Sequence, residues 1–118
     1  MSISHNVYVR SVNGSSKEWP YPKCSCSTWI AHWRNNYLYS TPSECPICGR
    51  TPDSNNPWVG GHVQKVRKNE NGDYVLTDDQ TIFIVPICDC CNKSGSIVFR
   101  VDKRYLVPMA ADECRIFS

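Results

Sequence analysis

The chain has 118 residues, of which 41% are hydrophobic and 20% are charged, and its formal net charge is +2. This length and apolar content predict a single folded domain over residues 1–118 and exclude a disordered chain. A charge so close to zero disfavours a protein that binds nucleic acid by electrostatics alone, although it allows a local basic surface.

Eight cysteines are many for this length, and they indicate either disulfide bonds or metal ligands. No apolar secretion signal follows Met1, and no apolar run is long enough to span a membrane. We therefore expect a cytoplasmic protein with reduced thiols and no membrane partner. A secreted form with up to four disulfides from the eight cysteines is the alternative.

The N-terminal part predicts a strand followed by a helix. Residues 5–12 alternate in part between apolar and polar side chains, as strands do. Residues 28–39 have helical spacing, with Trp29, Trp33 and Tyr37 four apart on one face. This aromatic stripe predicts core packing, and a base-stacking surface is the alternative.

The central and C-terminal parts predict short strands joined by turns. The Asn71-Gly72 pair is typical of a hairpin because these residues tolerate the positive φ of a tight reversal. The run before Cys88 is apolar and β-branched, which favours a buried strand. The predicted strands are residues 58–66, 74–77, 81–87, 97–101 and 105–109, with a short helix beginning near Cys91.

Two Cys-x-x-Cys pairs, Cys45/Cys48 and Cys88/Cys91, predict a tetrahedral zinc site. The sequence Cys-Pro-Ile-Cys-Gly over residues 45–49 is suited to the tight turn that aims two thiolates at one ion. Such a Zn²⁺ ion supplies on the order of 10–16 kcal/mol of apparent binding energy, most of it as folding energy. Cys90 could replace Cys91 as a ligand in a tighter Cys-x-Cys arrangement.

These motifs, over residues 45–49, 61–63 and 85–95, resemble the HNH or treble-clef (ββα-metal) endonucleases. The resemblance implies an α+β fold: a small, loop-rich, zinc-stabilised treble-clef core over about residues 45–95, with an added N-terminal strand and helix and a C-terminal strand region. It also implies that His62 is the general base that activates water, and that Asn92 is a ligand of a separate catalytic metal.

The sequence departs from this family at its catalytic positions. Gly61 stands where the family has an acidic residue or a second histidine, and Phe83 stands where it has an asparagine. Asp78 or Asp79 would have to supply the missing metal ligand. We therefore expect a non-catalytic zinc domain, with an HNH-type metal-dependent endonuclease as the alternative. His62 could instead ligate zinc in place of a cysteine, or bond a backbone carbonyl near the first Cys pair.

A second metal site is conceivable from the remaining ligands, which are Cys24, Cys26, His32 and Cys114. A Cys-x-Cys pair followed by a histidine on the next helix can bind a second Zn²⁺ ion, with the tail closing the site. The alternative is a pair of buried thiols and a histidine on the helix surface.

The expected partner of such a domain is a nucleic acid or a protein. Basic residues could form a surface for phosphate contacts, although nearby acidic residues dilute their charge. The candidates are Lys65, Arg67, Lys68, Lys93, Arg100, Lys103 and Arg104.

Overall fold

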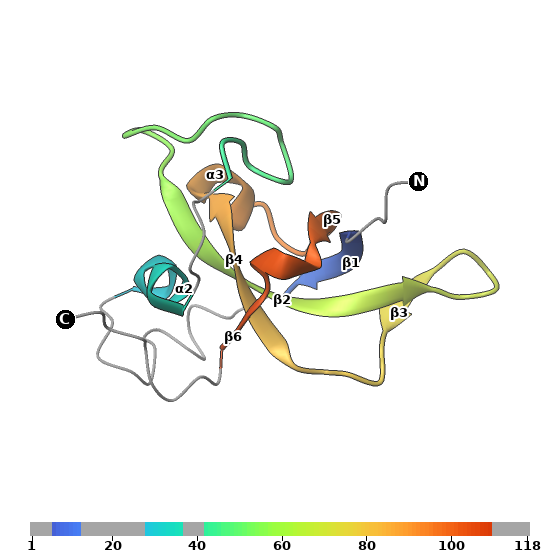
Figure 1. The fold of residues 1–118 in the computed structure, drawn as a ribbon. Helices are drawn as coiled ribbons and strands as arrows, with labels where there is room; N and C mark the ends of the chain where they lie inside the picture. Colours follow the sequence, from blue (N-terminus) through green and yellow to red (C-terminus); the bar gives the residue numbers. More distant parts are fainter. Residues whose placement is uncertain (1–5, 13–27, 37–41, 110–118) are drawn as a thin grey trace, which may run out of the picture.

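A computed structural model describes residues 6–12, 28–36 and 42–109 of the chain. Within these ranges the protein is α+β, with a six-stranded antiparallel sheet and two helices (Figure 1). The sheet order is β5-β1-β2-β4-β6, and β3 pairs with β2. The elements are β1 (Asn6–Ser11), α2 (Trp29–Asn36), β2 (Trp58–Lys68), β3 (Tyr74–Leu76), β4 (Ile82–Cys88), α3 (Asp89–Asn92), β5 (Val98–Asp102), the 3-10 helix η1 (Lys103–Tyr105) and β6 (Val107–Pro108).

The long strand β2 organises the sheet because β1, β3 and β4 all pair with it. Since side chains alternate along a strand, β2 presents Val63 to one face and His62 to the other. Val63 joins Val9, Val85 and other buried residues in the larger hydrophobic cluster. The predicted strands up to residue 101 are confirmed, and the first helix is described as far as Asn36. Residues 105–109, predicted as a strand, instead hold the end of η1 and the two-residue strand β6.

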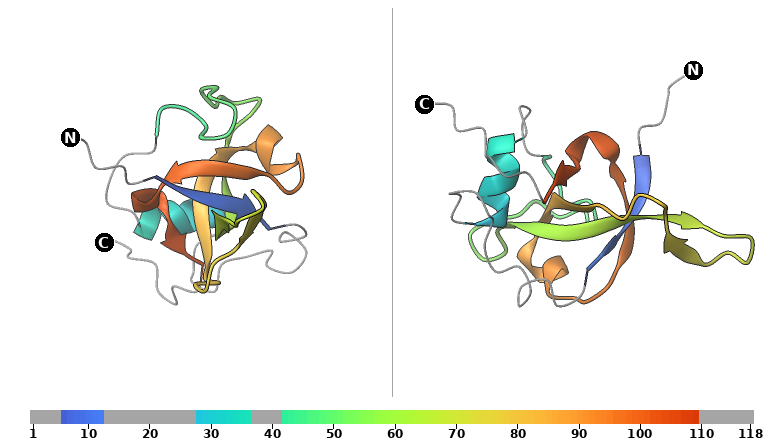
Figure 2. Two further views of the ribbon diagram at one scale, coloured as in Figure 1. Left: turned by 90° about the vertical axis from the view of Figure 1, so that its right-hand side faces the viewer. Right: turned by 90° about the horizontal axis from the view of Figure 1, so that it is seen from below.

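Helix α2 covers the second face of the sheet, beside β2 and β4 (Figure 2). Trp33 is 1% exposed and packs with Ile84 and Val107. Its indole nitrogen donates a hydrogen bond to the Tyr105 carbonyl at 2.7 Å. The prediction that Trp29 and Trp33 pack in the core is confirmed, whereas Tyr37 lies outside the described residues. Neither described helix is long and apolar enough to cross a membrane.

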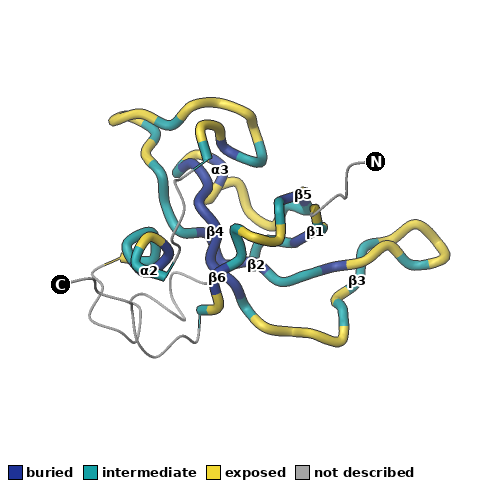
Figure 3. Tube along the Cα trace, viewed as in Figure 1, coloured by how far each residue is buried: buried dark blue, intermediate teal, exposed yellow. Residues whose placement is uncertain are grey.

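The predicted Asn-Gly reversal joins β2 to β3. Asn69 accepts hydrogen bonds from the backbone N–H groups of Asn71 and Asp73, both at 2.9 Å, and Gly72 has φ 85°. The tip of this hairpin extends from the sheet and is mostly exposed (Figure 3). The turn therefore fixes the register that places Tyr74 opposite Lys68.

Gly60 is expected to be essential for the packing of α2 on β2. A Cβ at Gly60 would lie 2.6 Å from the Trp29 backbone carbonyl carbon, whereas a Cβ at Gly61 would lie 2.6 Å from the terminal methyl of the Ile87 side chain. We predict that Gly60→Ala lowers the free energy of unfolding by about 1–3 kcal/mol, the usual cost of overpacking.

Urea unfolding of Gly60→Ala and Gly61→Ala, measured side by side, checks this prediction. Gly61→Ala is the matched control because its added Cβ meets side-chain atoms of Ile87, whereas the Cβ of Gly60→Ala meets the backbone of α2. An equal or larger loss in Gly61→Ala would contradict the proposed packing.

Candidate metal centre

The first pair of thiols lies on a tight turn. The Gly49 N–H donates to the Cys45 carbonyl and the Cys45 N–H donates to the Arg50 carbonyl, both at 2.8 Å. Gly49 has φ 76°, a left-handed conformation that favours glycine. The turn thus buries Cys45 and leaves Cys48 on the solvent side.

The second pair lies where β4 runs into α3. Cys88 is the last residue of β4, and Cys91 is inside α3. The side-chain oxygen of Asn56 accepts a hydrogen bond from the Cys90 N–H at 2.8 Å, which satisfies one of the free N–H groups at the start of the helix. The polar loop that carries Asn56 therefore fixes the helix start and, with it, Cys91.

The four sulfur atoms of Cys45, Cys48, Cys88 and Cys91 all lie within 4.8 Å of one another. Cys48 and Cys88 are 3.8 Å apart, sulfur to sulfur. Zn–S bonds of 2.3 Å in a tetrahedron place sulfur atoms about 3.8 Å apart. The Cys88 N–H also points at the Cys45 sulfur, at 3.5 Å. The donor set and its spacing fit one zinc ion.

Arg50 stands beside the exposed edge of this cluster. Hydrogen bonds from its backbone and guanidinium lower the pKa of Cys48 to about 6, which favours the thiolate that zinc binds. Burial, by contrast, raises the pKa of Cys91. The guanidinium also bonds the side chain of Cys90. The role of Arg50 was not predicted from the sequence, although a basic residue directly after Cys-x-x-Cys-Gly could have indicated a cation that stabilises the thiolates.

Cys90 does not belong to the four-sulfur cluster. It is exposed, whereas Cys91 is buried among the other three thiols. The structure therefore places Cys91, and not Cys90, at the fourth position. All five cysteines in the described parts of the chain are free thiols, so none of them forms a disulfide.

His62 and Asn92 are not brought together. His62 is 4% exposed and lies under α2, with its ring 4.6 Å from that of Trp29 between centroids. Asn92 lies near the opposite face, because its side-chain oxygen would be 3.7 Å from a Cβ at Gly61. Burial, followed by the nearby His32, lowers the pKa of His62 to about 4. A cleft with both side chains facing one substrate is not formed.

His32 is buried and not on the helix surface, so the surface alternative is wrong. It is 0% exposed, and its Nε2 is 3.1 Å from the Pro108 carbonyl. Sequence spacing placed it on a flank of the helix, but β6 packs over that flank. Its predicted metal-binding companions Cys24, Cys26 and Cys114 lie outside the described residues.

The other residues considered for a catalytic metal are engaged elsewhere. The Asp79 carboxylate accepts hydrogen bonds from Thr81 and pairs with Lys65 at 3.2 Å, and these contacts, led by the Thr81 hydroxyl, lower its pKa. Phe83 is buried in the larger hydrophobic cluster. Neither residue contributes to a site with Asn92.

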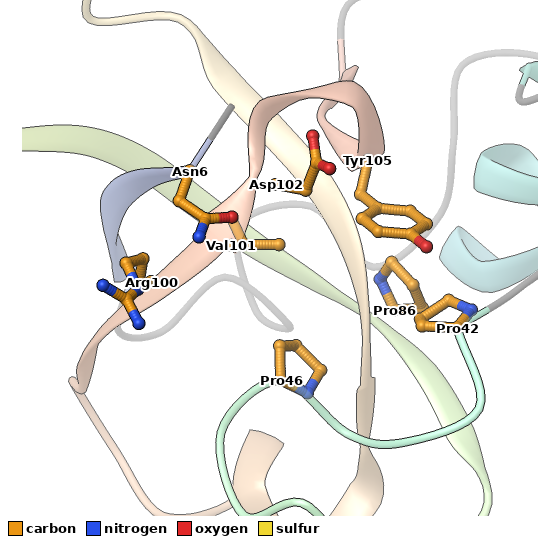
Figure 4. A pocket seen from close by; sticks show the side chains of 8 residues that line it. All are labelled: Asn6, Pro42, Pro46, Pro86, Arg100, Val101, Asp102 and Tyr105. Carbon is orange, nitrogen blue, oxygen red and sulfur yellow. The ribbon is translucent and has the colours of Figure 1, made fainter. Parts of the chain in front are cut away.

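A small pocket of about 120 Å³ opens between the first Cys turn and β5 (Figure 4). Prolines and the Tyr105 ring make much of its wall apolar, and neither His62 nor Asn92 lines it. The lining residues are Asn6, Pro42, Pro46, Pro86, Arg100, Val101, Asp102 and Tyr105. Without cysteine or histidine in its wall, it is not a thiol or imidazole metal site.

Comparison with known proteins assigns no family to the chain. No family model, no curated protein and no solved structure matches it. The structure therefore identifies a type of site and not a family: a four-cysteine cluster suited to one metal ion.

The buried His62 predicts a pH dependence of stability. Its pKa is about 4 in the folded protein against an ordinary 6.5, so its contribution is complete above pH 6.5 and is lost as the pH falls toward 4. From about pH 7.5 to 5 we expect a loss of about 2 kcal/mol in the free energy of unfolding.

Urea unfolding across this pH range, in the wild type and in His62→Gln, measures the effect. Glutamine removes the titrating group, so the stability of the variant should depend less on pH than that of the wild type. Loss of metal at low pH would affect both proteins equally and therefore cancels in the comparison. Parallel pH profiles for the two proteins would contradict the assignment.

Proposed function

We propose that the chain is a non-catalytic zinc domain in which one structural Zn²⁺ ion is held by Cys45, Cys48, Cys88 and Cys91. The observation that carries this proposal is the mutual approach of all four sulfur atoms to within 4.8 Å. Four thiolates saturate a tetrahedral ion and leave no open position for water or substrate, which is typical of structural and not catalytic zinc. A cytoplasmic, reducing location suits such a site.

We further propose that this site belongs to a treble-clef arrangement. Two ligands come from a turn, and two from the junction of a strand with a short helix, with the paired strands β2 and β4 between them. Trp58 pairs with Cys88, so the hairpin itself brings the second Cys pair back to the first. In this arrangement the ion fastens α3 and the first turn to the sheet.

Replacing single cysteines tests the ligand assignment. We expect Cys88→Ser to lose zinc and to destabilise the fold by several kcal/mol, because metal binding and folding are coupled. Cys90→Ser is the matched control, two residues away and outside the cluster, and it should keep both zinc and stability.

Elemental analysis of zinc per chain, together with urea unfolding, gives the result. Equal zinc loss in both variants would contradict the assignment. A second ion per chain that is lost in Cys24→Ser or Cys26→Ser would support the additional site predicted with His32 and Cys114; a single ion would reject it.

The proposed partner of this domain is a macromolecule that carries negative charge. Three of the predicted basic residues are paired with carboxylates and therefore offer less charge to a partner. Lys65 pairs with Asp79 at 3.2 Å and Lys93 with Asp89 at 2.8 Å. Arg104 pairs with Asp102 at 2.6 Å. Positive charge for binding a partner therefore has to come from basic side chains that are not paired with carboxylates.

The alternative function, an HNH-type endonuclease with His62 as base, is disfavoured by the position of that residue. A base buried under Trp29, with a pKa near 4, is weak at neutral pH and distant from solvent. We predict that zinc-loaded protein does not nick plasmid DNA with Mg²⁺, Mn²⁺ or Ni²⁺. Nicking that disappears in His62→Ala would establish the nuclease instead.

A further inference from the structure

A patch of aromatic and basic side chains covers one face of the sheet at the far end of β2 from the metal centre. Register places Tyr8 opposite Arg100 on one side and Val66 on the other, and Tyr74 opposite Lys68. Because side chains two apart share a face, Arg10 joins them. We call these residues, namely Tyr8, Arg10, Lys68, Tyr74 and Arg100, the tyrosine surface.

The two tyrosine rings lie against each other, with Tyr8 exposed and Tyr74 half-buried. Their centroids are 5.3 Å apart at an interplanar angle of 47°, across the strand that carries Val66. Val66 is only 5% exposed, whereas Tyr8 is 41% exposed and its neighbour Leu76 is 40% exposed. Lys68 places its ammonium 5.8 Å from the Tyr74 ring centre. Large exposed apolar groups fixed in this way indicate a contact surface.

The basic side chains of this surface retain their charge. Within the described parts of the chain, Arg10, Lys68 and Arg100 form no ion pair. The Arg10 guanidinium donates one hydrogen bond to the Tyr74 carbonyl, which orients it beside the ring and leaves its charge without a counter-ion. The carboxylate on the same face of β5, that of Asp102, is held by Arg104 through several hydrogen bonds. Lys65, on the opposite face of β2, is by contrast paired with Asp79. Positive charge is therefore concentrated on the face that carries the two tyrosine rings.

We propose that the tyrosine surface binds single-stranded nucleic acid, with bases stacked on Tyr8 and Tyr74 and phosphates held by Arg10, Lys68 and Arg100. Aromatic rings among cations on a sheet bind unpaired bases in this manner, since every base offers a face for stacking. This deepens the proposed function by naming the partner, and it rests on that function for the folded domain that displays the surface.

The dimensions of the surface suit a short stretch of single strand. From β3 to β5 it crosses three gaps between strands, roughly 14 Å in total. That is about four stacked nucleotides at about 3.4 Å each. Duplex DNA is a poor match because its bases are already stacked on one another. An acidic peptide would satisfy the cations but would leave the rings without stacking partners.

Fluorescence anisotropy with zinc-loaded, full-length protein tests the proposal. The probes are labelled single-stranded DNA and RNA of about 12 nucleotides, the corresponding duplex and a poly-glutamate peptide. We expect the single strands to bind more tightly than the duplex or the peptide. Three phosphate contacts predict a slope of log affinity against log salt of about −2. Tyr8→Ala and Tyr74→Ala should each weaken binding roughly 5- to 150-fold, while Tyr8→Phe should keep most of it.

Lys68 and Arg67 provide a matched pair of charge variants. They are adjacent on β2, both are exposed, and they point to opposite faces. Lys68→Ala should weaken binding and reduce the salt slope by about 0.7, whereas Arg67→Ala should change neither. This pair decides the question even if an alanine at Tyr8 disturbs folding.

Several outcomes would overturn the proposal while leaving the zinc domain intact. They are the absence of single-strand binding by protein that carries its zinc, tighter binding of the duplex or of the peptide, and equal effects of Lys68→Ala and Arg67→Ala. Zinc content and near-ultraviolet circular dichroism of every variant separate these outcomes from a failure of the metal-dependent fold, which would appear as loss of both.

Discussion

The meeting of four thiols from two separate turns is the constraint on which the rest of the structure depends. Cys45 and Cys48 come from a loop that does not pair with the sheet, and Cys91 comes from a helix of four residues. A helix of four residues is too short to be stable on its own. We propose that a shared metal ion supplies much of the energy that keeps both segments against the end of β2 and β4. The larger hydrophobic cluster includes Cys45, Cys88 and Cys91, so the metal-binding segments also pack against the apolar core.

The alternation of side chains along β2 gives the sheet two faces with different contacts. Gly61 and Val63 face the larger cluster and α3, while Gly60 and His62 face α2. This separation explains why His62 and Asn92, which the sequence predicted to share a site, lie on opposite faces of the sheet. The ring of His62 fills space beneath Trp29, and the same face farther along β2 carries Tyr8 and Tyr74 from the neighbouring strands. One strand thus supplies both a sealed contact with a helix and an open surface.

Local patterns allowed much of the fold to be predicted from the sequence. The Asn-Gly turn, the apolar run before Cys88 and the spacing of the cysteines each have a short-range physical cause. The position of His32 did not follow, because β6, more than 70 residues later, covers it. The tyrosine surface also could not be predicted. Alternation along the strand predicted that Tyr8 and Arg10 share one face. The register of β1 with β5 then places Arg100 beside Tyr8, and the register of β1 with β2 places Tyr74 beside it from across β2.

Stepwise addition of Zn²⁺ to the reduced, metal-free chain is the most direct test of the central claim. Near-ultraviolet circular dichroism reports the packing of buried aromatic residues such as Trp33. We predict that this signal is absent without metal and develops in proportion to zinc as the four-thiol site fills. A metal-free chain that keeps its full near-ultraviolet spectrum in excess chelator and reductant would contradict the account.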